Sequence, residues 1–493
     1  MRKSGILMHI SSLPSKYGVG TLGEEAYKFV DFLKDSGQSF WQILPIGPTS
    51  FGDSPYQSPS TYAGNPYFID FELLMHDGLL ENGDYERYDW GKDEEKVDFN
   101  ALFQNRYKVL RRAYRNGFER DKKEVEKFKK ENEYWLLDYG LFMAIKKYFG
   151  LKSFLQWDMS IRRGEKEERE RYREILKDDI DFYIYVQYLF FKQWRNLKEY
   201  ANKNGVEIIG DIPIYVAEDS VDVWSNKEIF CLDNDFNPIE VAGCPPDAFS
   251  ENGQLWGNPL YNWEALKNQD FRWWINRIKY ASSIYDVVRI DHFRAFSSYY
   301  GIPKGERTAK NGSWKIAYGE ELFKRVKEEI SNVRIIAEDL GVLSQDVYEL
   351  MEKVDFPGMK VLLFAFNSRE DSDYIPYKIE ANSVAYIGTH DNDTYMGWVN
   401  KADGEDLNFA KKYMNLTKEE GYNWGVIRTL LETKAEISVI QMQDILGLGN
   451  EARMNQPSTL GTNWLWRSKK DVFTKELSSK LYEVTKIFGR IPK

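Results

Sequence analysis

The fold is set by a strand-like segment with a charged end, Tyr285-Asp286-Val287-Val288-Arg289-Ile290-Asp291-His292-Phe293-Arg294. Its centre has the β-branched composition of a buried strand, apart from Arg289. Side chains two apart share one face of an extended chain, so Arg289 and Asp291 are expected to form a charge pair. Such a pair is either a structural ion pair or a means of keeping a carboxylate ionised, as a nucleophile must be.

Seven further segments have the short, continuous apolar runs that are typical of strands in a buried parallel sheet. They are residues 5–10, 40–46, 206–213, 333–341, 359–364, 384–391 and 437–444. Helical patterns separate the later ones, for example over residues 319–329 and 417–433. Eight strands alternating with helices predict an α/β fold, a (β/α)8 TIM barrel that spans residues 1–493 as one catalytic unit.

Two insertions interrupt this pattern. Residues from about 71 to 205 are mostly helical in pattern and highly charged, and runs such as Asp121-Lys122-Lys123-Glu124 are expected to be solvated helix faces. Residues from about 215 to 281 are loop-rich and are expected to cover the active site. Residues 47–70, dense in Gly, Pro, Ser and Tyr, exceed the usual connection of roughly 2–6 residues and indicate a functional loop.

Composition excludes several classes of protein. A formal net charge of −10 argues against nucleic acid as a partner, and no apolar run approaches the roughly 20 residues of a membrane span. The N-terminal residues resemble a first strand rather than a signal peptide, which predicts a cytoplasmic protein. Cys231 and Cys244 are expected to be free thiols, with a disulfide between them as the alternative. Four scattered histidines give no metal-ligand spacing, so we expect neither metal nor cofactor; the oligomeric state has no sequence signature.

Polar residues stand at the ends of six predicted strands: His9, Asp211, Asp291-His292, Glu338-Asp339, His390-Asp391 and Gln443-Asp444. Strand ends share one rim of a barrel, and active sites are built there. A lone Asp after a strand is commonly a helix N-cap, but six polar ends together predict a shared site. Without zinc ligands, a phosphate-binding loop or a Ser/His/Asp motif, the available chemistry is that of carboxylates. Two carboxylates that flank an acetal are the usual arrangement for cleaving glycosidic bonds.

Several motifs resemble those of the 4-α-glucanotransferases, the amylomaltases or disproportionating enzymes of glycoside hydrolase family 77, which are relatives of the α-amylases. The resemblance covers nearly the whole chain, in the family's order and spacing. The motifs are Gly52-Asp53-Ser54-Pro55-Tyr56, Gly210-Asp211-Ile212-Pro213, Pro245-Pro246-Asp247 with Trp256-Gly257-Asn258-Pro259, Arg289-Ile290-Asp291-His292-Phe293, Ala337-Glu338-Asp339-Leu340-Gly341, Gly388-Thr389-His390-Asp391-Asn392 and Arg453-Met454-Asn455-Gln456-Pro457. The resemblance implies a (β/α)8 barrel with inserted subdomains and no separate C-terminal β-domain.

The resemblance also implies roles for three carboxylates. Asp291 is similar to the family's nucleophile, Glu338 to its general acid/base, and Asp391 to the carboxylate that stabilises the transition state. The residues support the first two roles, because Arg289 keeps Asp291 charged and the apolar run before Glu338 would raise the pKa of Glu338. A retaining mechanism places two such carboxylates about 5–5.5 Å apart and proceeds through a covalent glycosyl intermediate.

Further residues are expected to bind the sugar chain, together with Arg289. His292, His390, Asp211 and Asn463 would hydrogen-bond hydroxyls, whereas Tyr56 and Trp256 would stack on glucose rings; packing in the core is the alternative for the histidines and for both aromatics. Residues 243–250 resemble a loop that overhangs the family's active site, and there Phe249 is expected to contact the acceptor. Some family members carry a bulky aromatic where this chain has Ala248.

Three functions are therefore compared. The first is a cytoplasmic transferase that cleaves an α-1,4-glucan and passes one part to the 4-hydroxyl of another glucan or of glucose. Its substrates would be maltooligosaccharides and fragments of starch or glycogen. The second is an α-1,4-glucan hydrolase that uses the same carboxylates with water as acceptor. The third is a carbohydrate-binding protein with an inactive site, against which the presence of all three carboxylates argues.

Overall fold

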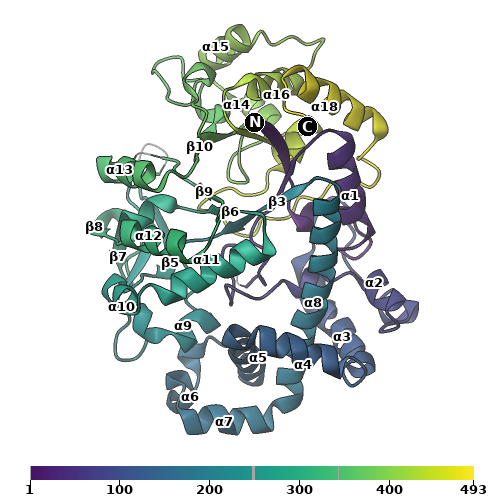
Figure 1. The fold of residues 1–493 in the computed structure, drawn as a ribbon, viewed down its shortest axis with the longest axis vertical. Helices are drawn as coiled ribbons and strands as arrows, with labels where there is room; N and C mark the ends of the chain where they lie inside the picture. Colours follow the sequence, from purple (N-terminus) through teal and green to yellow (C-terminus); the bar gives the residue numbers. More distant parts are fainter. Residues whose placement is uncertain (1, 51, 247–249, 342, 493) are drawn as a thin grey trace.

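The computed structural model describes residues 2–50, 52–246, 250–341 and 343–492 (Figure 1). Its central sheet consists of eight parallel strands: β1 (Lys3–Leu7), β2 (Phe40–Gln42), β3 (Glu207–Ile212), β6 (Val287–Ile290), β9 (Ile335–Ala337), β10 (Gly358–Val361), β11 (Ser383–Tyr386) and β12 (Ile437–Gln441). They lie in the order β10-β11-β12-β1-β2-β3-β6-β9. The ends of this order approach each other where the Ala337 amide donates to the Pro357 carbonyl at 3.0 Å. The sheet is thus a nearly closed barrel, as the sequence predicts.

Six predicted strands extend too far along the chain; those over 5–10, 40–46 and 333–341 end at Leu7, Gln42 and Ala337. Residues 362–364 form a 3-10 turn after β10, and residues 387–391 leave the sheet after β11. The Gln443-Asp444 pair lies in the short helix α17 (Met442–Ile445) rather than at the end of β12. The apolar pattern continues past each strand because the rim itself is buried, and hydrophobicity alone does not separate a buried strand from a buried turn.

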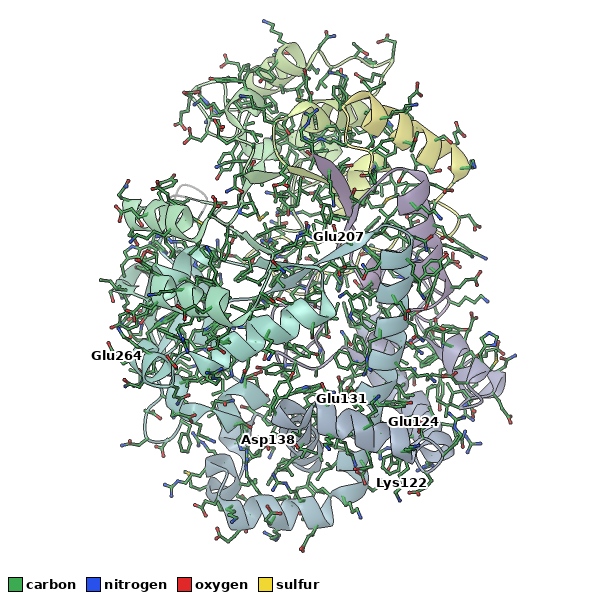
Figure 2. All side chains as sticks on the ribbon, in the orientation of Figure 1. Lys122, Glu124, Glu131, Asp138, Glu207 and Glu264 are labelled. Atoms are coloured by element: carbon green, nitrogen blue, oxygen red, sulfur yellow. The ribbon has the colours of Figure 1, made fainter. Side chains whose placement is uncertain are left out.

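The chain between β2 and β3 is helical. Its helices are α2 (Phe71–His76), α3 (Phe99–Gly117), α4 (Lys122–Glu131), α5 (Glu133–Tyr148), α6 (Met159–Arg163), α7 (Lys166–Ile175) and α8 (Lys177–Lys203). In Figure 1, α4 to α7 occupy the lower end of the molecule, and α8 runs from there to the barrel beside α1 (Glu24–Asp35). Lys122 and Glu124 are exposed, as expected of a solvated face (Figure 2).

A second sheet, antiparallel and four-stranded, follows β3 in the order β5-β4-β7-β8. Its strands are β4 (Glu240–Cys244), β5 (Gln254–Pro259), β7 (Ser298–Pro303) and β8 (Ser313–Ile316), and the helices nearby are α9 (Val221–Ser225), α10 (Trp263–Asn268) and α11 (Arg272–Ile284). The sequence indicated mainly loops over residues 215–281. The pairing was missed because the partner of β4, β7, comes only after β6, so no local pattern signals it.

The remaining helices surround the later strands. They are α12 (Gly319–Glu329), α13 (Gln345–Val354), α14 (Tyr395–Lys401), α15 (Gly404–Met414), α16 (Tyr422–Glu432) and α18 (Lys475–Ile487). The helix α12 matches the predicted helix over 319–329, whereas α16 is shorter than the predicted 417–433. The two chain ends meet near α18, where the Arg2 guanidinium donates to the Phe488 carbonyl at 2.7 Å.

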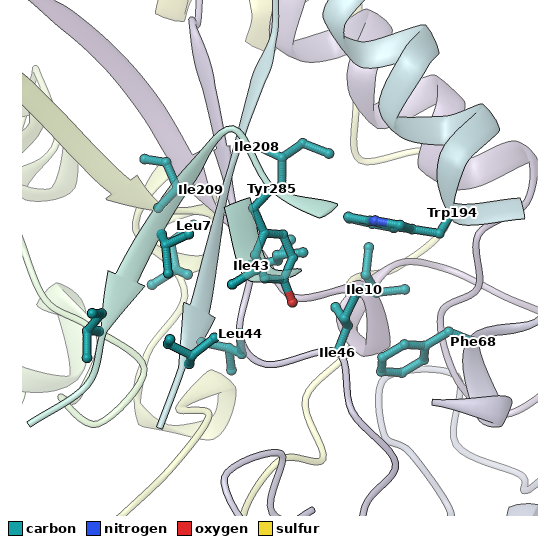
Figure 3. Packing of buried hydrophobic residues seen from close by; sticks show 14 of the residues in the cluster. Leu7, Ile10, Ile43, Leu44, Ile46, Phe68, Trp194, Ile208, Ile209 and Tyr285 are labelled. Carbon is teal, nitrogen blue, oxygen red and sulfur yellow. The ribbon is translucent and has the colours of Figure 1, made fainter. Parts of the chain in front are cut away.

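The core beneath the site packs α8 against the strands that carry it (Figure 3). Trp194 of α8 is buried, lies edge-on to Tyr285 and donates to the Ile284 carbonyl at 3.1 Å. A Cβ atom at Gly210 would lie 2.2 Å from the Tyr285 ring, so only glycine permits this approach. Burial of one such large side chain contributes about 1.5–3 kcal/mol. This packing fixes β3 and β6, and thereby Asp211 opposite Arg289.

Candidate active site

One buried guanidinium holds two carboxylates at the end of β6. Arg289 Nη1 donates to Asp211 Oδ2 at 2.6 Å and to Asp291 Oδ1 at 3.0 Å. The Arg289 and Asp211 side chains are 3% and 0% exposed, whereas Asp291 keeps 27% of its side chain exposed. The predicted charge pair is confirmed, and Asp211 joins it because the register places Asp211 directly opposite Arg289.

This arrangement controls the charge of Asp291. Burial raises the pKa of the Asp291 carboxyl to about 6, and the Arg289 guanidinium opposes that rise. The negative charge of Asp211 adds to the rise. Because 27% of the Asp291 side chain stays exposed, water still solvates its anion. Asp291 is therefore an ionised, partly accessible carboxylate at neutral pH.

Glu338 stands at the equivalent place after β9 and has a different environment. Its Oε2 accepts from the His292 backbone amide at 2.6 Å, and its Oε1 accepts from the Leu340 amide at 2.9 Å. Burial raises the pKa of Glu338 to about 8, with a further rise from the charge of Asp291 and an opposing effect of Arg289. Glu338 is therefore a protonated carboxylic acid when Asp291 is ionised.

His292 connects the two carboxylates through its backbone. Its φ of 52° is in the left-handed region, which non-glycine residues seldom adopt and which accumulates at functional sites. This backbone conformation accompanies the hydrogen bond from the His292 amide to Glu338. The His292 ring meets Trp256 edge-on, with centroids 4.8 Å apart and planes at 89°. Two predicted sugar-binding residues are thus in contact, on the side of Glu338.

Asp391 follows β11 and is held from several sides. Asn455 Nδ2 donates to its Oδ1 at 2.6 Å, and His390 Nε2 lies 3.4 Å from the same oxygen. Arg453 donates to the Asp391 carbonyl at 2.6 Å, which fixes the backbone as well. The charge of Asp391 also contributes to the raised pKa of Asp291. The third carboxylate therefore belongs to the same electrostatic site.

Tyr56 links His390 to the cluster formed by Arg289 and Asp211. Its hydroxyl donates to Asp211 Oδ2 at 2.8 Å and lies 3.4 Å from His390 Nδ1. The Tyr56 and His390 rings stack at 5.0 Å, and Trp464 packs against both, at 5.8 Å and 5.9 Å. The loop over residues 47–70 thus enters the site, as its composition predicts.

The side chains of three other predicted residues hydrogen-bond to the backbone. Asn463 hydrogen-bonds the Gln456 amide and the Thr459 carbonyl, and so closes its own loop. Asp339 accepts from the Met359 amide at 2.6 Å, and Asp444 accepts from the Tyr395 amide at 2.7 Å. Two of the polar strand ends therefore hold neighbouring elements. Phe249 and Ala248 fall outside the described residues.

Three further properties concern the described part of the chain. Within it, no cluster of three or more His, Cys, Asp or Glu side chains has the arrangement of a metal site. No helix among residues 2–50, 52–246, 250–341 and 343–492 has both the length and the apolar character needed to cross a membrane. Cys231 and Cys244, both described, are thiols rather than a disulfide, as expected.

Comparison with known proteins identifies the group to which this site belongs. Residues 8–472 match the family model described as 4-alpha-glucanotransferase. The chain belongs to the 4-alpha-glucanotransferase family. A 4-alpha-glucanotransferase of Clostridium butyricum is 51% identical over 98% of this chain and 100% of its own length. A 4-alpha-glucanotransferase of Thermus thermophilus is 42% identical over 94% of each chain.

Solved structures agree with this family. Amylomaltase from Streptococcus agalactiae in complex with acarbose has a TM-score of 0.98 and 45% identity over 100% of both chains. Amylomaltase from Corynebacterium glutamicum, at 17% identity, matches the fold with a TM-score of 0.79 over 100% of this chain and 75% of its own. The protein is thus a glycosyltransferase that acts on α-1,4-glucans, and the hydrolase alternative is not favoured.

Two residues of this 4-alpha-glucanotransferase site were not singled out from the sequence. Asn455 stands in the motif over residues 453–457, so a signal for its contact with Asp391 was present. Trp464 has a φ of 66° and backs the Tyr56–His390 pair, and no feature of the sequence distinguishes it from a core tryptophan. Its place depends on how the loop after residue 455 returns to the barrel.

Proposed function

We propose that this 4-alpha-glucanotransferase works by a retaining mechanism, with Asp291 as nucleophile and Glu338 as general acid and base. The observation that supports the assignment is the contrast between their environments. Both side chains are partly exposed, but Asp291 is paired with Arg289 and its pKa is raised only to about 6, whereas the pKa of Glu338 is raised to about 8. A nucleophile has to be ionised and a general acid has to be protonated at the same pH.

The first step breaks the glycosidic bond of the donor. An Asp291 carboxylate oxygen attacks the anomeric carbon, and the bond to the leaving oxygen breaks as Glu338 gives that oxygen its proton. The shortened glucan leaves and the other part stays as an ester on Asp291. In the second step Glu338 takes the proton of the acceptor 4-hydroxyl, whose oxygen displaces Asp291 and restores an α-1,4 bond.

The surrounding residues are assigned to charge stabilisation and sugar binding. Asp391 would stabilise the positive charge that develops on the ring, and Asn455 and His390 hold its carboxylate in place. Tyr56, Asp211, His292 and His390 would contact the donor sugar, with Arg289 fixing the carboxylates. Trp256, Asn463 and Phe249 stay predicted contacts for the rest of the glucan.

The substrate class follows from the relatives as well as the carboxylates. The Streptococcus agalactiae amylomaltase has been solved with acarbose, which supports maltooligosaccharides as substrates of this chain. We place the enzyme in the cytoplasm, with no nucleic-acid or membrane partner and no cofactor. Residues of about 71–205 and about 215–281 would be subdomains of one catalytic barrel, the second covering the site.

Incubation with maltotriose tests the proposal. Transfer predicts a ladder of shorter and longer maltooligosaccharides while the concentration of reducing ends stays constant. Rising reducing ends would show that water is the acceptor, and an unchanged substrate would show a binding protein. Trapping a glycosyl ester on a peptide that contains Asp291, by mass spectrometry of acid-quenched protein, tests the covalent step separately.

A further inference from the structure

We propose that Trp314 forms a second glucan-binding surface, separate from the catalytic groups, on which a long α-1,4-glucan stacks. The proposal rests on the proposed function, because it takes the glucan as the ligand. Of fifteen tryptophans, all in the described residues, Trp314 is the most exposed, with 45% of its surface accessible. The other tryptophans are buried or half-buried, as large aromatic side chains usually are.

The exposed ring is held in one orientation. The Arg294 guanidinium lies 4.2 Å from the ring centroid of Trp314. The buried Tyr300 meets the indole at 5.2 Å with an interplanar angle of 64°. Protein groups therefore back the indole while nearly half of its surface stays accessible. A rigid aromatic surface loses little conformational entropy when a ligand binds, which favours binding.

The position of Trp314 links it to the active site. It lies on β8, at one edge of the antiparallel sheet, and the opposite edge, β5, carries Trp256, which contacts His292. Arg294 comes three residues after Asp291, and its Nη2 lies 3.5 Å from Ser344, in the segment that follows Glu338. The surface thus lies on the Glu338 side, where the proposed mechanism brings the leaving glucan and the acceptor.

The chemistry of the surface fits a neutral sugar polymer. Glucose rings present C–H faces that pack on flat aromatic surfaces, and an α-glucan carries no charge for the acidic protein to repel. Ile316 lies two residues further along β8 and is 80% exposed, so it extends the apolar surface on the same face of the strand. The rival occupant is a second copy of the chain.

The test compares Trp314→Ala with Trp314→Phe and with a control variant. The control is Tyr377→Ala, which removes an aromatic side chain with 65% exposure from the turn Pro376–Lys378. Each protein is run in native gels with and without soluble starch, and its rate of maltotriose disproportionation and its Tm are measured. Size-exclusion chromatography reports association between copies.

We expect Trp314→Ala to weaken starch binding about two- to tenfold, as loss of one aromatic contact implies. Trp314→Phe and Tyr377→Ala should bind starch as the parent does, and all variants should keep the maltotriose rate and the Tm. Starch binding by Trp314→Ala equal to that of the parent would overturn the proposal. An equal loss on starch and maltotriose would also overturn it, as would a change confined to self-association.

The gel measurement is independent of turnover, so the two proposals fail separately. If the parent enzyme leaves maltotriose unchanged but binds starch in a way that depends on Trp314, the transferase mechanism is contradicted and the Trp314 proposal is supported. A parent that transfers maltotriose normally, with starch binding indifferent to Trp314, contradicts only this inference.

Discussion

Asp291 and Glu338 occupy equivalent positions on neighbouring strands, yet the groups around their carboxyls differ. Each comes one residue after its strand, and the last strand residues, Ile290 and Ala337, are register partners. Their amides donate in the same way, Asp291 to the Ile212 carbonyl and Glu338 to the Ile290 carbonyl, both at 3.0 Å. The backbone positions and backbone hydrogen bonds of the two residues are therefore equivalent.

The pKa difference comes mainly from the groups that surround each carboxyl. A buried guanidinium from Arg289 reaches Asp291, whereas the Glu338 oxygens accept from two backbone amides. A full positive charge stabilises a carboxylate far more than amide donors do, so Asp291 loses its proton first. The barrel supplies the position of the two groups, and one arginine decides which is the anion.

The strongest way to break this comparison is Asp291→Asn. We expect turnover of maltotriose to fall to background, at least about 10⁴-fold, because an amide does not form the glycosyl ester. The fold should survive, since the amide oxygen still accepts from Arg289, and Tm measures this. Activity within about tenfold of the parent, in protein shown by mass spectrometry to be free of deamidation, would exclude Asp291 as nucleophile.

Glu338→Gln tests the other half of the comparison. Transfer from maltotriose should fall about 10²–10⁴-fold, because the leaving oxygen no longer receives a proton. Attack on a glycosyl fluoride, whose leaving group needs no proton, should be much less affected. The ratio of the two rates is the measurement, and equal losses on both donors would contradict the role of Glu338 as acid.

Much of this contrast could be predicted from the sequence. The alternation of strands and helices gives the barrel, and side chains two apart on a strand give the Arg289–Asp291 pair. The apolar residues before Glu338 predict the raised pKa. These predictions succeed because they depend on neighbours along the chain or on the regular geometry of one strand.

What could not be predicted depends on contacts between distant segments. The contact of Asp211 with Arg289 follows from the register of β3 against β6, which the sequence does not specify. Asn463 hydrogen-bonds within its own loop, and the contact of the next residue, Trp464, with the His390 ring depends on the path of that loop. The antiparallel sheet pairs strands from both sides of β6, and that pairing has no local signature.

The pH profile sharpens the comparison with a smaller effect. The parent kcat/KM should be bell-shaped, falling below about pH 6 as Asp291 is protonated and above about pH 8 as Glu338 ionises. These two limits belong to the interacting pair rather than to single residues. Arg289 lowers the pKa of Asp291, so weakening that contact should move the acid limb to higher pH.

Arg289→Lys weakens the contact while keeping the charge, because the ammonium of a different side chain replaces the guanidinium whose Nη1 donates to both Asp211 and Asp291. We expect the acid limb to rise and kcat/KM at neutral pH to fall by about tenfold, equivalent to roughly 1.4 kcal/mol. The alkaline limb should move less than the acid limb. An acid limb that stays in place would mean that Arg289 does not control the charge of Asp291.

The smallest effect is expected for Tyr56→Phe, which removes the hydroxyl that donates to Asp211 at 2.8 Å and keeps the ring stacked on His390. A single hydrogen bond contributes about 0.5–1.5 kcal/mol, more when its partner is charged, so kcat/KM should fall only a few-fold. The Tyr56 hydroxyl contacts Asp211, which shares Arg289 with Asp291. The loss of kcat/KM should therefore appear in the pH range where Asp291 titrates, and the alkaline limb should stay in place. Tyr114→Phe is the matched control, since its hydroxyl donates to Asp178 at 3.0 Å in the helical segment. A shifted alkaline limb in Tyr56→Phe, or an equal loss in the control, would show that the two carboxylates are not tuned separately.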